Sequence, residues 1–549
     1  MPLVRMSRFL AAAVCTVALL GQNAPSSRHL FIRVALANTF DKPVSGRLLI
    51  FIEPGSGARE VDTNPFHPRA VSVTAKEVHD LSPGAAVDVD ADDIAYPAAI
   101  SQLPRGNYQA QAVIDLNHSY NYGGRAPGDP ISEVTPLTHF PGPSTEKTTL
   151  TLAKTVGEHQ PPKGVLSAAE QKAAEAAIRT EDFVSPVLSR FWGRPIHMRA
   201  LVVESPGYKT SAARRYPTVY FTHGFGGQLR YLRVEAERLY ARMAEKKMPP
   251  MVWIMLDESS PTGTHEFADS VNNGPWGQAL TKEFIPYLES HYRLDRRSRA
   301  RFLNGHSSGG WATLWLQVTY PKVFGGTWST SPDPSDFHDF TGPNLYAPHA
   351  NVYRRPDGSL YPLVRDKGKV LATFEDFAHL EKVLGPYGGQ LASFEWVFSP
   401  RGPDGRPMQM FDRTIGDVHP EVVQAWQKYD IVHILKSNWP KLAPDLNGKI
   451  HVIVGTADTF YLDGPAHLLK AALDSLHANA QVTFLEGRTH MDLYKVGDDP
   501  RGLYDQIANA MYRTWLASER SGPVRISSAL PFRFAPAARK WSNGVVAAK

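Results

Sequence analysis

The amino-acid sequence predicts an α/β protein in which a doubly wound, mostly parallel sheet follows an N-terminal antiparallel β-sandwich. Residues 29–153 contain short stretches that alternate apolar and polar side chains, as half-buried strands do. Residues 183–520 alternate instead between continuous apolar strands and amphipathic helices. A G-x-S-x-G sequence lies between one of these strands and the next helix. With 549 residues, the chain is long enough for more than one domain.

The first residues have the pattern of a secretory signal peptide. Arg5 and Arg8 precede the twelve apolar residues 9–20, and small and polar residues follow up to Ala24. Because spanning a bilayer takes about 20 apolar residues, we expect residues 1–24 to be removed rather than to stay as a membrane span. The mature protein is then secreted or periplasmic. The single cysteine, Cys15, lies in this run, so the mature chain has no disulfide.

The charge distribution and the lack of complete metal-binding motifs argue against nucleic acids and metal ions as binding partners. The formal net charge is +5 and the basic residues are scattered, so we expect no nucleic-acid binding. In the acidic stretch 88–93, Asp93 stands where a calcium-binding EF-hand loop needs glycine. The stretch 265–269 lacks the second histidine of the zinc motif H-E-x-x-H. We therefore expect neither a metal nor another cofactor.

The N-terminal strands define the first predicted domain, residues 28–155. The stretches 29–40, 45–54, 107–117 and 146–154 carry the alternating pattern, and Gly, Pro and Asn separate them. Residues 156–182 are interpreted as a linker helix, because Ser167 and Glu170 form a capping-box start before an alanine-rich stretch.

The second predicted domain covers residues 183–520. We expect strands at about 216–224, 250–259, 300–305, 325–331, 448–458 and 480–487, and helices at about 231–247, 272–293, 310–320 and 464–478. The alternation lapses at about 331–444, which we interpret as a functional insertion because it is long and rich in Pro, Gly and aromatic residues. Residues 521–549 are expected to form a C-terminal extension.

Ser307 is the candidate nucleophile. It lies between Gly305 and Gly309, directly after a predicted strand and before a predicted helix. A turn of this kind holds the serine in strained backbone angles, and side chains in place of the two glycines would collide with the adjoining strand and helix. Chance also produces this pattern in some chains of this length, so the interpretation depends on the partners of the serine.

A serine hydroxyl needs a base and an acid that orients the base, in the chain order Ser, Asp or Glu, His. His490 follows the last predicted strand and is the expected base. Asp458 and Asp463 both follow the preceding strand, but Asp463 has a sufficient role as the N-cap of the next helix. We therefore favour Asp458 as the acid, with Asp333 and Asp336 as alternatives.

Two backbone N–H groups should stabilise the oxyanion that forms during attack by the serine. One is expected from Ser308, the residue after the nucleophile. The other is expected from Phe225, in the glycine-rich turn 223–227 that follows an earlier strand.

The region from about residue 183 to 516 resembles the putative-esterase branch of the α/β-hydrolases, which includes esterase D, feruloyl and enterochelin esterases and the secreted mycolyltransferases. The matching segments are YPTVYFTHGFGG, FADSVNNGPWGQALTKEFIPYLESHYR, NGHSSGGW, GTADTFYLDG and GRTH. The resemblance implies an α/β-hydrolase fold with Ser307 as nucleophile, Asp458 as acid and His490 as base. It also places Trp276 near the substrate cleft, although packing in the core explains this tryptophan equally well.

The expected function is therefore that of a secreted serine esterase acting on a small-molecule or glycan-linked ester without a cofactor. Three alternatives stay open. An acyltransferase of the mycolyltransferase type would pass the acyl group to an alcohol instead of water. A serine peptidase of the prolyl-oligopeptidase type is disfavoured, because the N-terminal part is too short for its propeller. A catalytically inert secreted glycan-binding protein would not need the three catalytic residues.

Overall fold

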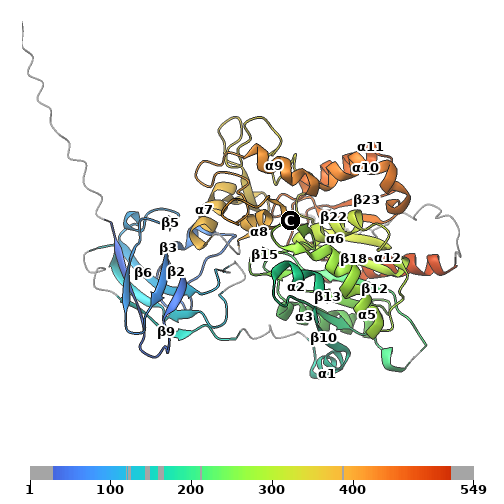
Figure 1. Cartoon of the computed structure of the whole chain (residues 1–549), viewed down its shortest axis with the longest axis horizontal. Helices are drawn as coiled ribbons and strands as arrows, with labels where there is room; N and C mark the ends of the chain where they lie inside the picture. The colour runs from blue at the N-terminus through green and yellow to red at the C-terminus, as the bar shows by residue number, and fades with distance from the viewer. Residues whose placement is uncertain are drawn as a thin grey trace, which may run out of the picture.

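The computed structural model describes residues 29–118, 120, 125–142, 149–158, 166–210, 213–385 and 389–520. Figure 1 shows an N-terminal β-sheet beside a larger α/β core, with α7, α8 and α9 along one side of both. The expected signal peptide, residues 1–24, and the expected C-terminal extension, residues 521–549, lie outside the described residues. Within the described residues, no helix combines the length and apolar character needed to cross a membrane.

The N-terminal region forms one hydrogen-bonded sheet of nine strands in the order β4-β1-β9-β7-β6-β2-β3-β5, with β8 paired to β6. The strands are β1 (Phe31–Leu36), β2 (Val44–Pro54), β3 (Ser72–Leu81), β4 (Ala86–Asp90), β5 (Ala95–Tyr96), β6 (Gly106–Asp115), β7 (Pro130–Ser132), β8 (Thr135–Phe140) and β9 (Thr149–Thr155). All pairs are antiparallel except β1 with β9. The sequence predicted antiparallel strands here, whereas the division into the two sheets of a sandwich is not seen in the hydrogen bonding.

The connection between the two regions is shorter than the sequence suggested. Helix α1 (Ala168–Ala177) begins with the predicted capping box of Ser167 and Glu170. Strand β10 (Ile178–Val184) follows without a break and pairs antiparallel with β11 (His197–Val203) of the core sheet. The core sheet therefore starts at Ile178 rather than after residue 182. Helix α2 (Pro186–Trp192) lies between these two strands.

The core sheet has eight strands in the order β10-β11-β13-β12-β18-β19-β22-β23. The other six are β12 (Thr218–Thr222), β13 (Val252–Leu256), β18 (Arg301–His306), β19 (Gly326–Thr330), β22 (Ile450–Gly455) and β23 (Gln481–Leu485). These six run parallel to one another, so the predicted mostly parallel sheet is confirmed. Five of them fall within a predicted strand, and β18 extends one residue beyond its predicted end, to His306.

Helices cover both faces of this sheet, as a doubly wound fold requires. In β12, Val219 and Phe221 point to one face, where they pack with α3 (Leu229–Ala244) and α12 (Gly502–Arg520). Tyr220 points to the opposite face, where it packs with α5 (Ile285–His291) and α6 (Ser308–Thr319). Helix α11 (Asp463–Ser475) connects β22 with β23.

The predicted helix at 272–293 is divided into three parts. It consists of α4 (Trp276–Ala279), a π-helical turn (Leu280–Phe284) and α5. Two short hairpins precede it, formed by β14 (Ser259–Ser260) with β15 (Gly263–Thr264) and by β16 (Asp269–Ser270) with β17 (Gly274–Pro275). The wider helical turn fits the spacing of four residues between the apolar side chains at 276, 280, 284 and 288.

The insertion between β19 and β22 has secondary structure of its own. Its elements are β20 (Pro362–Asp366), β21 (Lys369–Thr373), α7 (Phe374–Leu384), α8 (Gln390–Phe398), α9 (Pro420–Trp426) and α10 (Ile431–Leu446). Its apolar residues form one core cluster with α6, β22 and α11. The insertion is therefore packed onto the face of the core sheet that carries α6 and α11 rather than attached as a loose loop.

Candidate active site

Ser307 lies in the strained turn that the sequence predicted. It is the N-cap of α6, directly after β18, and its backbone angles are φ 61° and ψ −126°. A positive φ is rare for a residue with a side chain and marks stored backbone strain. A Cβ on Gly305 would lie 2.1 Å from the carbonyl oxygen of Gly309, and one on Gly309 would lie 2.4 Å from that of His223. The two glycines are therefore required by the close approach of strand, helix and neighbouring turn.

Asp458 and His490, the expected acid and base, are hydrogen-bonded to each other. Asp458 follows β22, and its Oδ2 lies 3.0 Å from Nδ1 of His490, which follows β23. Both side chains are buried, and Oδ1 of Asp458 accepts a hydrogen bond from the backbone N–H of Phe460. Burial alone would raise the pKa of Asp458, but the facing imidazole and these hydrogen bonds lower it. The carboxylate is thus kept ionised, as an orienting acid must be.

His490 lies beside the nucleophile. Its ring contacts that of His306, the residue before Ser307, at a centroid distance of 4.3 Å. The ring of Phe460 packs edge-on against His490 at 4.9 Å. No hydrogen bond between Ser307 and His490 is present among the described residues, and such bonds are often long until substrate is bound. The chain order Ser, Asp, His and the placement of each residue after a parallel strand are those of an α/β-hydrolase.

The expected oxyanion donors flank the serine. A Cβ on Gly224 would lie 3.0 Å from Cβ of Ser307, so the turn that carries Phe225 packs against the nucleophile. Within the described part of the chain, the backbone N–H groups of Phe225 and Ser308 have no protein acceptor. Two unpaired N–H groups beside a serine hydroxyl are what an oxyanion hole requires.

His223 fixes that turn in place, a role that we did not predict. Its Nδ1 lies 2.8 Å from the carbonyl oxygen of Gly224, and its Nε2 lies 3.0 Å from the backbone nitrogen of Glu258, after β13. Burial alone would lower the pKa of His223, but Asp257 and Glu258 raise it. The turn is therefore tied to the loop that follows the neighbouring strand.

Asp333 has a different role from the one considered for it. Its Oδ2 accepts a hydrogen bond of 2.6 Å from Oγ of Ser308, so it holds the residue that is expected to supply an oxyanion donor. Burial raises the pKa of Asp333 to about 6. Asp336, the other alternative acid, pairs with His338 at 2.6 Å instead of His490. Neither is hydrogen-bonded to the base.

Asp463 and Trp276 also differ from expectation. Asp463 is the first residue of α11 rather than its N-cap, and it pairs with Arg365 at 2.6 Å. Trp276 stacks on His265 at 3.7 Å in the core, and its indole N–H donates to the carbonyl oxygen of Asn273. It does not line the pocket at Ser307. The structure therefore favours the interpretation that Trp276 packs in the core, because both its ring and its indole N–H have partners in the core.

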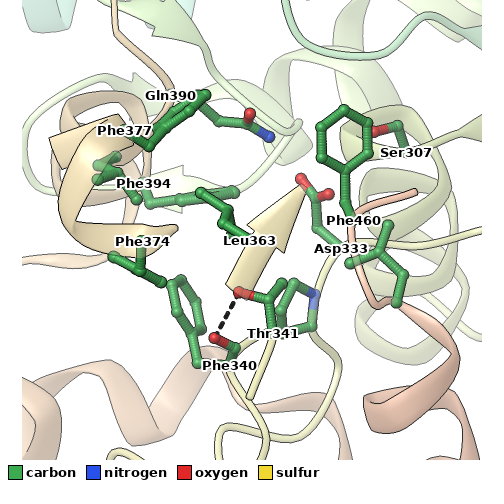
Figure 2. A pocket seen from close by; sticks show the side chains of 13 residues that line it. Ser307, Asp333, Phe340, Thr341, Leu363, Phe374, Phe377, Gln390, Phe394 and Phe460 are labelled. Atoms are coloured by element: carbon green, nitrogen blue, oxygen red, sulfur yellow. Dashed lines mark hydrogen bonds between the residues drawn. The ribbon is translucent and has the colours of Figure 1, made fainter. Parts of the chain in front are cut away.

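A pocket opens from Ser307 into the insertion, and Figure 2 shows side chains from α7 and α8 facing the nucleophile across it. Its lining is mostly apolar and comprises Ser307, Asp333, Pro334, Phe340, Thr341, Leu363, Phe374, Phe377, Gln390, Leu391, Phe394, Phe460 and Leu462. Apart from Ser307 and Asp333, none of these residues was singled out from the sequence, because most of them come from the insertion, which has no regular alternation.

One group of side chains in the described residues is close enough to share a metal ion. Ligand atoms of Asp336, His338 and Asp430 lie within 4.8 Å of one another. Each already has a protein partner, because Asp336 pairs with His338 and Asp430 caps α10 through the backbone N–H of His433. His265 of the rejected zinc motif is fully buried, which lowers its pKa to about 3.

Comparisons with known proteins place this site in a family. The family model described as "Putative esterase" matches residues 197–499. The uncharacterized protein YbbA of Bacillus subtilis (strain 168) is 26% identical over 137 residues, which is 23% of this chain and 53% of that protein. The chain thus spans about half the length of this curated relative.

Several solved structures are similar at low sequence identity. A ferulic acid esterase has a TM-score of 0.39 at 12% identity, over 62% of this chain and 98% of its own. The fluorophosphonate-binding serine hydrolase F of Staphylococcus aureus has a TM-score of 0.36 at 14% identity, over 62% and 98%. An S-formylglutathione hydrolase from Agrobacterium tumefaciens has a TM-score of 0.36 at 13% identity, over 62% and 95%.

Proposed function

The chain belongs to the putative esterase family, and on this premise we propose that it is a serine esterase that hydrolyses a carboxylic ester through an acyl-serine intermediate. The observation that carries the proposal is Ser307, held at a positive φ between the His490–Asp458 pair and two unpaired backbone N–H groups. This arrangement combines an activated nucleophile with an oxyanion hole.

The proposed reaction has two steps. Nε2 of His490 takes the proton of the Ser307 hydroxyl while Oγ forms a bond with the ester carbonyl carbon. The N–H groups of Phe225 and Ser308 stabilise the oxyanion. The bond to the alcohol oxygen then breaks, and His490 donates its proton to the departing alcohol.

The second step regenerates the enzyme. His490 takes a proton from water, the hydroxide oxygen bonds to the acyl carbon, and the bond to Oγ of Ser307 breaks. The acid leaves, and Ser307 regains its proton from His490. In both steps Asp458 keeps the Nδ1–H of His490 directed at its carboxylate, so that Nε2 faces the serine.

A fluorophosphonate probe tests the nucleophile, because it bonds covalently to an activated serine and releases fluoride. We expect labelling of the wild-type protein and none of Ser307→Ala. Ser290→Ala, an exposed serine of α5, is the matched control and should be labelled like the wild type. Equal labelling of wild type and Ser307→Ala, or of neither, would contradict the proposal.

Product analysis tests hydrolysis itself. With a simple ester and water alone, the free acid should accumulate in step with the alcohol. If an added alcohol instead captures most of the acyl group as a new ester, the protein is an acyltransferase.

We further propose that residues 1–24 direct the protein out of the cytoplasm and are removed. The support is the sequence pattern of Arg5, Arg8 and the apolar run that follows. Expression of the full chain followed by N-terminal sequencing of the exported protein tests this. Recovery of the intact N-terminus in the cytoplasmic fraction would contradict it.

A further inference from the structure

The chemistry of the pocket at Ser307 indicates what part of a substrate it accepts. Five phenylalanines and four other apolar residues provide most of its lining. The polar members besides Ser307 are Asp333, Thr341 and Gln390, and no lysine or arginine lines it. A carboxylate or phosphate group would find no cation there, and it would face the carboxyl group of Asp333. The pocket therefore suits an uncharged apolar group.

Helix α7 forms a wall of this pocket with one of its faces. Phe374 and Phe377 both line the pocket, and they lie three residues apart, on the same side of a helix with 3.6 residues per turn. In Figure 2 they lie on the side of the pocket opposite Ser307. Their positions depend on where α7 is held.

The second half of α7 packs on the N-terminal sheet. Leu380, Val383 and Leu384 are buried in one apolar cluster with Phe51 of β2 and Val73 of β3. This cluster lies on the other side of the N-terminal sheet from its own main core, since neighbouring residues Ile50 and Ile52 belong to that core. Figure 1 shows α7 beside β3 and β5.

Polar contacts fix both ends of α7 to the same sheet. Near the start of the helix, Oδ1 of Asp376 accepts hydrogen bonds from Nε of Arg69 at 2.8 Å and from the hydroxyl of Tyr96 at 3.1 Å. At the end of the helix, the buried Arg47 of β2 donates to the carbonyl oxygens of Lys382 and Val383 at 3.2 and 2.7 Å. A cation at a helix C-terminus also interacts favourably with the helix dipole.

We infer that the N-terminal sheet is a specificity-determining part of the enzyme, because it holds α7 as the wall of a pocket for an uncharged apolar group of the ester. Arg69, Tyr96 and Arg47 are positioning residues, which act through Phe374 and Phe377 and do not touch the substrate. This inference rests on the proposed esterase function for its kinetic consequences, but the contact between sheet and helix can be tested separately.

The kinetic test uses the full chain with Arg69→Ala and Tyr96→Phe combined. These changes remove the two partners of Asp376 in the N-terminal region and keep the aromatic ring of residue 96. Asp376 can still cap α7 through Thr373. We measure kcat and KM for methyl esters from acetate to octanoate and for acetate esters from methanol to octanol. The two series separate an apolar acyl group from an apolar alcohol.

For the double variant, the ratio of kcat/KM for the longest ester to that for the shortest should fall about tenfold in one of the two series. We expect the change mainly in KM, because small misfits in an apolar pocket have effects of this size. Phe377→Ala should change the same series. Arg33→Ala removes an ion pair with Asp88 elsewhere in the sheet and is the matched control. It should keep the wild-type preference. Unchanged preferences in both series would overturn the inference, although the ester hydrolysis itself would still support the proposed function.

Hydrogen–deuterium exchange tests the contact without any substrate. Backbone amides of residues 374–384 should exchange at least several-fold faster in the double variant and in Tyr96→Phe alone, but not in Arg33→Ala. Unchanged exchange in a double variant with an intact near-ultraviolet circular dichroism spectrum would overturn the inference. If the wild-type protein hydrolyses no ester of either series, the proposed function fails, and the exchange comparison still decides whether the sheet holds α7.

Discussion

At the scale of single residues, the site gives different partners to two buried aspartates, of which the sequence favoured Asp458 as the acid and kept Asp333 as an alternative. Asp458 faces Nδ1 of His490, whereas Asp333 accepts the hydroxyl of Ser308. Both follow parallel strands of the core sheet, at the edge where the nucleophile lies. Which aspartate meets the histidine depends on the loops after β19 and β22, and these loops have no local pattern that fixes their course.

Asp458→Asn should lower kcat by about 10⁴-fold, because an amide facing Nδ1 favours the wrong tautomer of the imidazole. Asp333→Asn should lower it by less than about tenfold, since an amide oxygen can still accept from the Ser308 hydroxyl. Steady-state hydrolysis of a simple ester by the two variants measures this difference. A larger loss in Asp333→Asn than in Asp458→Asn would assign the orienting acid to Asp333.

At the scale of elements, the sequence predicted those strands and helix ends that have a clear local pattern of residues. The apolar runs gave β12, β13, β18, β19, β22 and β23, and the capping box gave the start of α1. Ser307 could be predicted because the turn itself requires Gly305 and Gly309. Strand β10 was missed because it is an edge strand with polar outward residues, and it follows α1 without a turn residue.

At the scale of elements, the contact between α7 and α8 also contains a buried carboxyl group whose titration should affect stability. The carboxylate of Glu381 in α7 accepts hydrogen bonds from the backbone N–H groups of Gln390 and Leu391 at the start of α8. Burial raises the pKa of Glu381 from 4.5 to about 7. Between these two values the folded protein binds more protons at this residue than the unfolded chain does, so the stability that it contributes is complete below pH 4.5 and is lost as the pH rises to 7.

Glu381→Gln should remove this dependence. The free energy of unfolding of the wild type should fall relative to the variant between pH 5 and 7, by at most about 1.4 kcal/mol for each pH unit. Urea denaturation of both proteins at pH 5, 6, 7 and 8 measures the difference. Parallel pH profiles for the two proteins would show that Glu381 does not titrate in this range.

At the scale of the whole molecule, the N-terminal region contacts the rest of the chain through α7 of the insertion and through Phe66, whose ring packs against that of Phe460 after β22. The sequence predicted two separate domains because the strand pattern changes between residues 155 and 183. It could not predict the contact of α7 with the N-terminal region, since the residues involved lie about 300 positions apart, as in Arg69 and Asp376. Long-range packing of this kind leaves no periodic signal in the chain.

This contact should couple the unfolding of the two regions. Leu380 is fully buried between the sheet and α7, and replacing such a leucine by alanine typically costs about 2–5 kcal/mol. We expect one calorimetric transition for the wild type and two separate transitions for Leu380→Ala, because the sheet then unfolds without the support of α7. Leu316→Ala is the matched control. Leu316 is also fully buried, but it lies in α6 and packs in a cluster that contains no residue of the insertion. Leu316→Ala should lower the transition temperature but leave a single transition. Two resolved transitions in the wild type would contradict the prediction, because the sheet would then unfold independently of α7.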